Sequence, residues 1–150
     1  MLDEKIIKDK IVRKLQKDFR NYGVEDFPLD VMRYSPQNIV GELLIKSLGT
    51  RPTQYLDRNL QINPVSFGNF IVFEYQWRIT IINKDFKSQN EIFSITTALV
   101  NSMQAVDFSN IEGASRFMPI DISEPLYNEE QMFQYRSLTF TLPVITYIGD

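Results

Sequence analysis

Residues Phe70–Asn83 read FIVFEYQWRITIIN, and the pattern of this stretch decides the fold. Apolar side chains occupy every second position on one face, and mostly polar side chains occupy the other. The apolar face holds Phe73, Tyr75, Trp77, Ile79 and Ile81, opposite Val72, Glu74, Gln76, Arg78, Thr80 and Ile82. Alternation over this length is typical of an antiparallel strand with one buried face. The stretch therefore predicts a sheet that packs one face against a core.

An amphipathic helix is predicted next, over Gln89–Ala105. Its apolar side chains recur every three or four positions at Ile92, Ile95, Leu99, Met103 and Val106, broadened by Phe93 and Val100. This spacing is that of a helix with one face toward a core. Ser88 is the expected N-cap, because its hydroxyl can accept a hydrogen bond from a free backbone N–H group.

Two more strands are predicted towards the end of the chain. Tyr135–Ile148 (YRSLTFTLPVITYI) alternates between its two faces, and we expect Pro143 to interrupt its ladder of hydrogen bonds. Arg116–Ile122 is also predicted as a strand, and its interior Pro119 favours a position at the edge of the sheet. The second half of the chain is therefore predicted to run in the order strand, helix, strand.

A polar turn, Glu124–Met132, separates these two strands, and we expect a hairpin tip at Asn128, Glu129 and Glu130. Adjacent carboxylates also occur at Asp3/Glu4 and Glu25/Asp26. General acid–base catalysis needs two carboxyl groups held in different environments, which neighbours on exposed turns do not provide. We interpret all three pairs as solvated residues and expect no catalytic site among them.

A first helix is predicted over Asp3–Tyr22, with Ile7, Ile11, Leu15 and Phe19 on one side. Asp3 is the expected N-cap, and Gly23 suits the C-terminal stop. The opposite face is basic, with Lys10, Arg13, Lys17 and Arg20. Two interpretations stay open for this basic face: it is solvated, or it contacts an acidic neighbour.

The middle of the chain is less regular. Prolines break the segment around Leu29–Tyr34, which allows only a short extended piece. Leu43–Leu48 favours a strand, although a short helix also fits the run. Gly49–Asn69 predicts a long loop or an extended β-arm, and such a segment is usually functional or disordered. Its apolar residues either fold back on the core or contact a neighbouring subunit: Tyr55, Leu56, Leu60, Ile62, Val65 and Phe67.

Composition bounds the class of protein. The 150 residues, 43% of them apolar, are most simply one domain (residues 1–150) with a well-filled core. The sequence contains no His and no Cys, which excludes catalytic triads, thiolate nucleophiles and zinc–sulfur sites. The net charge of −3 does not indicate a nucleic-acid binder. We therefore expect no enzyme, no cofactor and no metal.

The fold class that follows is α+β, a mainly antiparallel sheet packed against two helices, with an extended loop or β-arm. The aromatic face of Phe70–Asn83 is interpreted as core rather than as a platform for stacking bases, because no cluster of Lys or Arg accompanies it. No signal-peptide pattern and no apolar run of about 18 residues is present, so we expect a soluble chain without a membrane association.

The order of elements resembles that of the phage neck or tail-terminator proteins. The resemblance lies in the Asp3–Tyr22 helix, the long irregular segment, the aromatic strand Phe73–Ile82, the second helix and the closing strands. The run Ile122–Tyr127 (ISEPLY), leading into Ser137–Leu142 (SLTFTL), is similar to the way such subunits end. Together these parts cover about two-thirds of the chain.

The resemblance implies a structural virion protein, located in the tail or neck and made in the host cytoplasm. Such subunits form a ring, usually a hexamer, that caps the tail tube and joins it to the neck or connector protein, while DNA passes through without specific binding. The six apolar residues of Gly49–Asn69 would then form the subunit interface. Asn128, Glu129 and Glu130 would face the tube or the neck, and acidic residues would face the bore.

Two alternatives stay open. In the first, the chain is another head–tail connector or a tail-completion subunit, which belongs to the same broad class. In the second, it is a non-viral small-ligand-binding α+β domain, with a pocket between the sheet and the Gln89–Ala105 helix.

Overall fold

The computed structural model describes residues 2–28, 38–53, 69–84, 88 and 90–149, and these form two helices and one six-stranded sheet. The fold is the α+β class predicted from the sequence. The elements are α1 (Glu4–Asp18), β1 (Gly23–Asp26), β2 (Gly41–Thr53), β3 (Asn69–Asn83), α3 (Glu91–Gln104), β4 (Met118–Ile122), β5 (Leu126–Asn128) and β6 (Phe133–Gly149).

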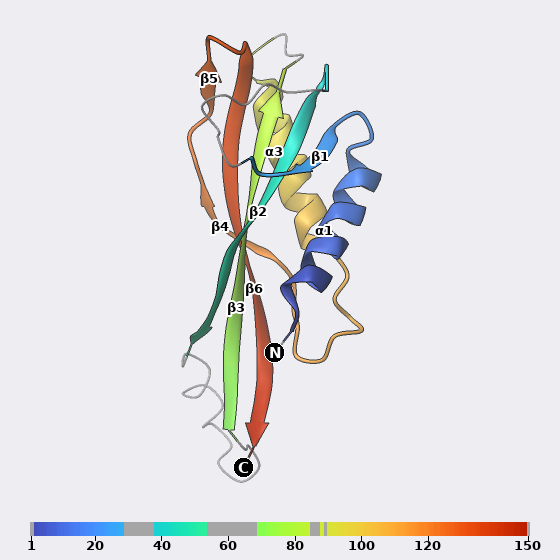
Figure 1. The fold of residues 1–150 in the computed structure, drawn as a ribbon, viewed down its shortest axis with the longest axis vertical. Coiled ribbons are helices and arrows are strands. Elements are labelled where there is room, and N and C mark those ends of the chain that lie inside the picture. Colours follow the sequence, from blue (N-terminus) through green and yellow to red (C-terminus); the bar gives the residue numbers. More distant parts are fainter. Residues whose placement is uncertain (1, 29–37, 54–68, 85–87, 89, 150) are drawn as a thin grey trace.

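Three long strands form the centre of the sheet, in the order β2, β3, β6 (Figure 1). β3 pairs antiparallel with both neighbours, so that Trp77 lies opposite Ser47 on one side and Phe140 on the other. Short strands flank this centre: β1 pairs parallel with β2, while β4 and β5 pair antiparallel with β6. The sheet is therefore mainly antiparallel.

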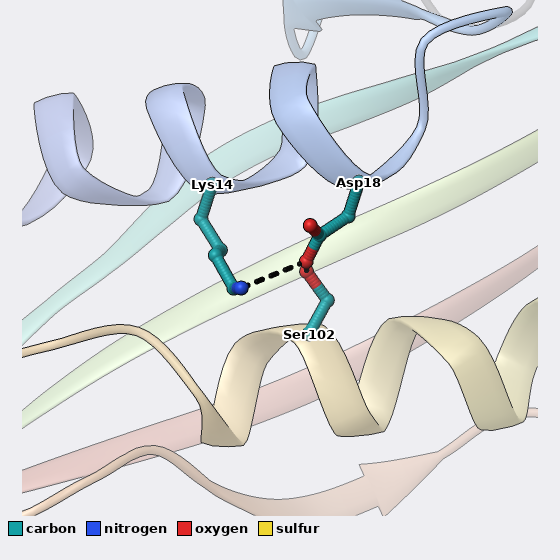
Figure 2. A network of polar contacts seen from close by, with 3 residues as sticks. All are labelled: Lys14, Asp18 and Ser102. Atoms are coloured by element: carbon teal, nitrogen blue, oxygen red, sulfur yellow. Dashed lines mark hydrogen bonds and ion pairs between the residues drawn. The ribbon is translucent and has the colours of Figure 1, made fainter.

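Both helices cover the same face of the sheet. In Figure 2 the strands of the sheet run behind both of them. Ile7, Ile11 and Leu15 of α1 are fully buried, and so are Ile92, Leu99 and Met103 of α3. They pack against the face of β3 that the alternation predicted to be apolar, including Tyr75 and Ile79, and against Leu138 and Phe140 of β6. The main core lies between this face and the two helices.

A polar contact also joins the two helices at their facing surfaces (Figure 2). The carboxylate of Asp18 in α1 accepts a hydrogen bond of 2.7 Å from the hydroxyl of Ser102 in α3. Lys14, one turn earlier in α1, lies 3.1 Å from the same carboxylate oxygen. The Ser102 hydrogen bond, with the charge of Lys14 nearby, holds the pKa of Asp18 below its usual value.

The helix boundaries correct several predictions. Asp3 is the N-cap of α1, and its side chain accepts a hydrogen bond from Lys5 N at 2.9 Å. The helix ends at Asp18 rather than at Tyr22, because the chain turns after Phe19 to enter the sheet. Gly23 is consequently the first residue of β1 and not a helix stop.

The start and the outer side of α3 also differ from the prediction. Asn90 occupies the N-cap position without a side-chain hydrogen bond, and Ser88 contributes only its carbonyl, which accepts from Glu91 N. Val100 packs against the core as expected. Phe93 does not, since 49% of it is exposed, and its ring lies 5.8 Å from the guanidinium carbon of Arg136.

The ambiguous run Leu43–Leu48 is a strand and not a short helix, as part of β2. β2 continues through Gly49–Thr53, which the sequence predicted to be irregular. A bulge between Ser47 and Gly49 allows this, with Gly49 at a φ of 97° that favours glycine. The rest of the predicted irregular segment, residues 54–68, and the short piece Leu29–Tyr34 lie outside the described residues.

Pro119 and Pro143 bear on two predictions about prolines in strands. Pro119 lies in the edge strand β4, as predicted. Pro143 does not interrupt β6, contrary to the prediction, and pairs with Glu74 in an unbroken register. Its carbonyl accepts from Ser115 N, and the N and C=O of one residue point to the same side of a strand. The missing N–H therefore faces away from β3, where no ladder bond is lost.

Candidate assembly surfaces

The second face of the sheet lies opposite the two helices and carries its own small apolar cluster. Leu44, Ile82 and Phe133 are 1%, 3% and 4% exposed, and Phe27 and Tyr135 pack against them. Each of the three central strands contributes to this cluster, because alternate residues of a strand point to opposite faces. The sheet is therefore apolar on both faces at this end.

A groove of about 490 Å³ is open above this cluster. Its base is formed by β2, β3 and β6, and its sides by Phe27 and the β5–β6 hairpin. The lining residues are Phe27, Leu44, Thr80, Ile82, Tyr127, Asn128, Glu129, Glu130, Phe133, Tyr135 and Ser137. The hydroxyls of Thr80 and Ser137 bond each other at 2.9 Å, which leaves a largely apolar base.

Asn128 builds the hairpin tip, and a hairpin is present as predicted. It joins β5 to β6, so Leu126–Asn128 is a strand and not part of the predicted polar turn Glu124–Met132. The Asn128 side chain accepts from Gln131 N at 3.0 Å, and its carbonyl accepts from Met132 N at 2.8 Å. This turn presents Glu129 and Glu130 as exposed side chains at the rim of the groove. The tip thus adds two carboxylates to an apolar hollow, a combination that the sequence analysis did not predict.

The two short strands that pair with β6 also expose apolar side chains. Met118, Ile120 and Ile122 of β4 are 43–50% exposed, and Leu126 and Tyr127 of β5 are each 47% exposed. β4 forms the edge of the sheet, and Tyr127 also lines the groove. Exposed apolar residues mark interaction sites where they form a contiguous patch.

The basic face of α1 lies on the other layer of the molecule. Lys10 is partly buried, with its ammonium 5.9 Å from the Phe108 ring centre and 3.4 Å from Asn110 Oδ1. Arg13 and Lys17 of α1, and Arg20 just after the helix, are exposed, and among the described residues they make no ion pair.

A second hollow, of about 440 Å³, lies between α1 and the edge of the sheet. Lys8 and Asp26 form an ion pair of 2.6 Å there, and Ser47 and Trp77 also line it. Trp77 is 3% exposed, and its indole N–H has no acceptor among the described residues. Most buried polar groups are hydrogen-bonded, so an unpaired donor here is unusual.

The predicted pocket between the sheet and the second helix is not among these hollows, neither of which is lined by a residue of α3. Ile92, Leu99 and Met103 fill that interface. Within the described part of the chain, acidic residues form no cluster of three that could hold a metal ion. The described helices include none that is long and apolar enough to cross a membrane.

The structure describes one of the two predicted sites, the turn, and not the other, the subunit interface. Asn128, Glu129 and Glu130 come together at the groove rim. The predicted interface residues lie outside the described residues: Tyr55, Leu56, Leu60, Ile62, Val65 and Phe67. Comparison of the sequence with models of known protein families and with curated proteins found no match.

Proposed function

We propose that this chain is a structural subunit that assembles with copies of itself into a ring at the end of a phage tail tube. In this proposal the ring joins the tube to the neck, contains six subunits as in the proteins it resembles, and lets DNA pass without specific binding. A neighbouring connector ring or a tail-completion ring would use the same contacts.

The observation that carries the proposal is the extension of the sheet past both helices. In Figure 1 the far ends of β3 and β6 run on beyond α1 and α3. Phe70 and Ile71 lie on this extension and are half-buried, and Ile145 is 37% exposed. A ribbon of a few strands is only marginally stable by itself in water. Packing of its faces against a neighbouring subunit supplies the missing burial.

The outer edge of this extension favours contact through side chains rather than through backbone pairing. β1 pairs with β2 only up to Ile45, which leaves the following residues of β2 at the edge. That edge carries the bulge at Ser47/Gly49 and then Pro52. Bulges and prolines are features that prevent uncontrolled pairing of edge strands. These features therefore favour an assembly with a fixed number of subunits over open-ended aggregation through the edge strand.

A ring requires head-to-tail contacts, in which one surface of each subunit meets a different surface of the next. β2 and β3 lead directly into residues 54–68, where the sequence analysis placed the interface side chains. We expect the double variant Tyr55→Ser/Phe67→Ser to impair assembly and leave the subunit folded. Ile39→Ser is the matched control, because Ile39 is 80% exposed and precedes the opposite end of β2.

Size-exclusion chromatography with light scattering tests this proposal, and circular dichroism verifies folding of each variant. Assembly of the wild type and of Ile39→Ser, with loss of assembly in the double variant, supports the arm as the contact. Loss of folding in the double variant would place Tyr55 and Phe67 in the core instead and would contradict their interface role.

The second candidate is a small-ligand-binding domain, favoured by the hollow of about 440 Å³ that Lys8, Asp26 and Trp77 line. A thermal-shift screen separates the two functions, since a specific shift that Trp77→Phe abolishes supports the ligand function and a uniform lack of shifts counts against it.

A further inference from the structure

The groove on the second face of the sheet has the features of an acceptor for another protein surface. Its base is apolar, through Leu44, Ile82 and Phe133, and its rim is acidic, through Glu129 and Glu130. Neither rim carboxylate makes an ion pair among the described residues. A partner that fits would present an apolar side chain accompanied by cations.

The outer face of α1 presents such a combination. Ile6 is 45% exposed, and Arg13 and Lys17 follow at seven and eleven positions, which places all three on one side of a helix. About 10 Å along the helix axis separate Ile6 from Arg13, given a rise of 1.5 Å per residue. Asp9 also lies on this side, but Lys5, Arg13 and Lys17 leave the stripe positively charged.

The two surfaces belong to opposite layers of the subunit. α1 packs on one face of the sheet, and the lining residues place the groove on the other face, beside β5. The sheet stands between them, so the stripe of one molecule cannot reach its own groove. Any contact between them joins two copies, and because the surfaces differ, that contact is head-to-tail.

We infer that the groove binds the outer face of α1 from a second copy of this chain, with Ile6 in the apolar part and Arg13 and Lys17 beside Glu129 and Glu130. The inference rests on the proposed ring and names one of its contacts. Rim charges of this kind select the partner and the orientation more than they add affinity, while the apolar contact is the less salt-sensitive part. Raised salt therefore weakens the assembly without abolishing it.

Charge reversal tests this contact. The variants Glu129→Lys/Glu130→Lys and Arg13→Glu/Lys17→Glu each place like charges opposite one another, and we expect each alone to associate at least tenfold more weakly than the wild type. The control is Glu25→Lys/Glu112→Lys, which makes the same charge change at two other exposed carboxylates and is expected to associate as the wild type does.

Recombination of the charges makes the test specific. An equal mixture of the two reversed variants restores opposite charges at every contact if the subunits alternate, so a ring with an even number of subunits closes again. A chain that carries all four reversals restores the pairing within one protein, whatever the number of subunits. Sedimentation velocity measures both, and circular dichroism verifies that each variant is folded.

The outcomes separate this inference from the proposed function. A wild type that stays monomeric at every concentration contradicts the ring itself. A wild type that assembles, with reversed variants that assemble equally well, overturns the groove contact and leaves the ring standing. Reversed variants that dissociate and are not rescued by the four-fold reversal also overturn it, since the four residues then do not face each other. Rescue by both routes supports it.

Discussion

Asp18 accepts a 2.7 Å hydrogen bond from the hydroxyl of Ser102, a residue 84 positions later in the chain. This bond ties the last turn of α1 to the last turn of α3 (Figure 2). It is therefore a long-range polar contact in a layer otherwise held together by apolar packing.

The contact predicts a pH dependence. The Ser102 hydrogen bond lowers the pKa of Asp18 in the folded chain, so its stabilising contribution is present above the unfolded pKa and is lost as the pH falls through the folded pKa. We expect Ser102→Ala to reduce the free energy of unfolding by at most about 1 kcal/mol at neutral pH, because the carboxylate is partly solvated. Urea unfolding between pH 2 and pH 7 measures it.

The difference between the wild type and Ser102→Ala should shrink below the pKa of Asp18, where the carboxyl is protonated in both chains. Asp18→Asn serves as the control, since it removes the titrating group altogether. A difference that stays constant down to pH 2 would mean that Ser102 contributes through packing and not through the carboxylate.

Gly41 and Gly49 predict losses of stability that differ in size within one strand. A Cβ on Gly41 would lie 2.1 Å from the carbonyl oxygen of Ile82 and 2.7 Å from the Tyr22 ring. We expect Gly41→Ala to destabilise the fold by about 3 kcal/mol or more, because a backbone atom must move. Gly49→Ala meets open space and only the strain of its φ of 97°, at about 1 kcal/mol. Thermal unfolding compares the two, and equal losses would contradict the close approach at Gly41.

Two threonines on the second face of the sheet predict opposite signs. The hydroxyl of Thr141 is buried and has no partner in the part of the chain that the structure describes, whereas that of Thr80 is bonded to Ser137. We expect Thr141→Val to leave stability unchanged or to raise it by up to about 1 kcal/mol, since an unpaired buried hydroxyl is unfavourable. Thr80→Val should cost about 1 kcal/mol because it leaves Ser137 unpaired. Chemical denaturation measures both, and a loss at Thr141 as large as that at Thr80 would reveal a partner for its hydroxyl.

The sequence predicted the body of the fold because alternation is a local signal. The apolar face of Phe70–Asn83 and the spacing of Ile92, Leu99 and Met103 depend on neighbours in the chain, and both match the observed core. The edge position of Pro119 followed from its missing N–H group in the same way. Each of these features is visible within a few residues.

The features that were missed depend on distant parts of the chain. Gly49–Thr53 lacks a strand pattern, yet it pairs with the first half of β3, so tertiary pairing overrides local preference there. Pro143 is tolerated because its N side faces Ser115, a residue 28 positions earlier. The groove needs Phe27 brought beside Leu44 and the hairpin tip, and no local pattern predicts that juxtaposition.

The mass of the purified chain's assembly is the measurement that tests the central claim most directly. Native mass spectrometry of the wild type at micromolar concentration should show one closed species, six times the 17.6 kDa subunit if the resemblance extends to ring size. Its population should fall in the two charge-reversed variants and return in their mixture. A wild type that remains a 17.6 kDa monomer at every concentration, or that forms an open-ended ladder without a preferred number, would contradict the account.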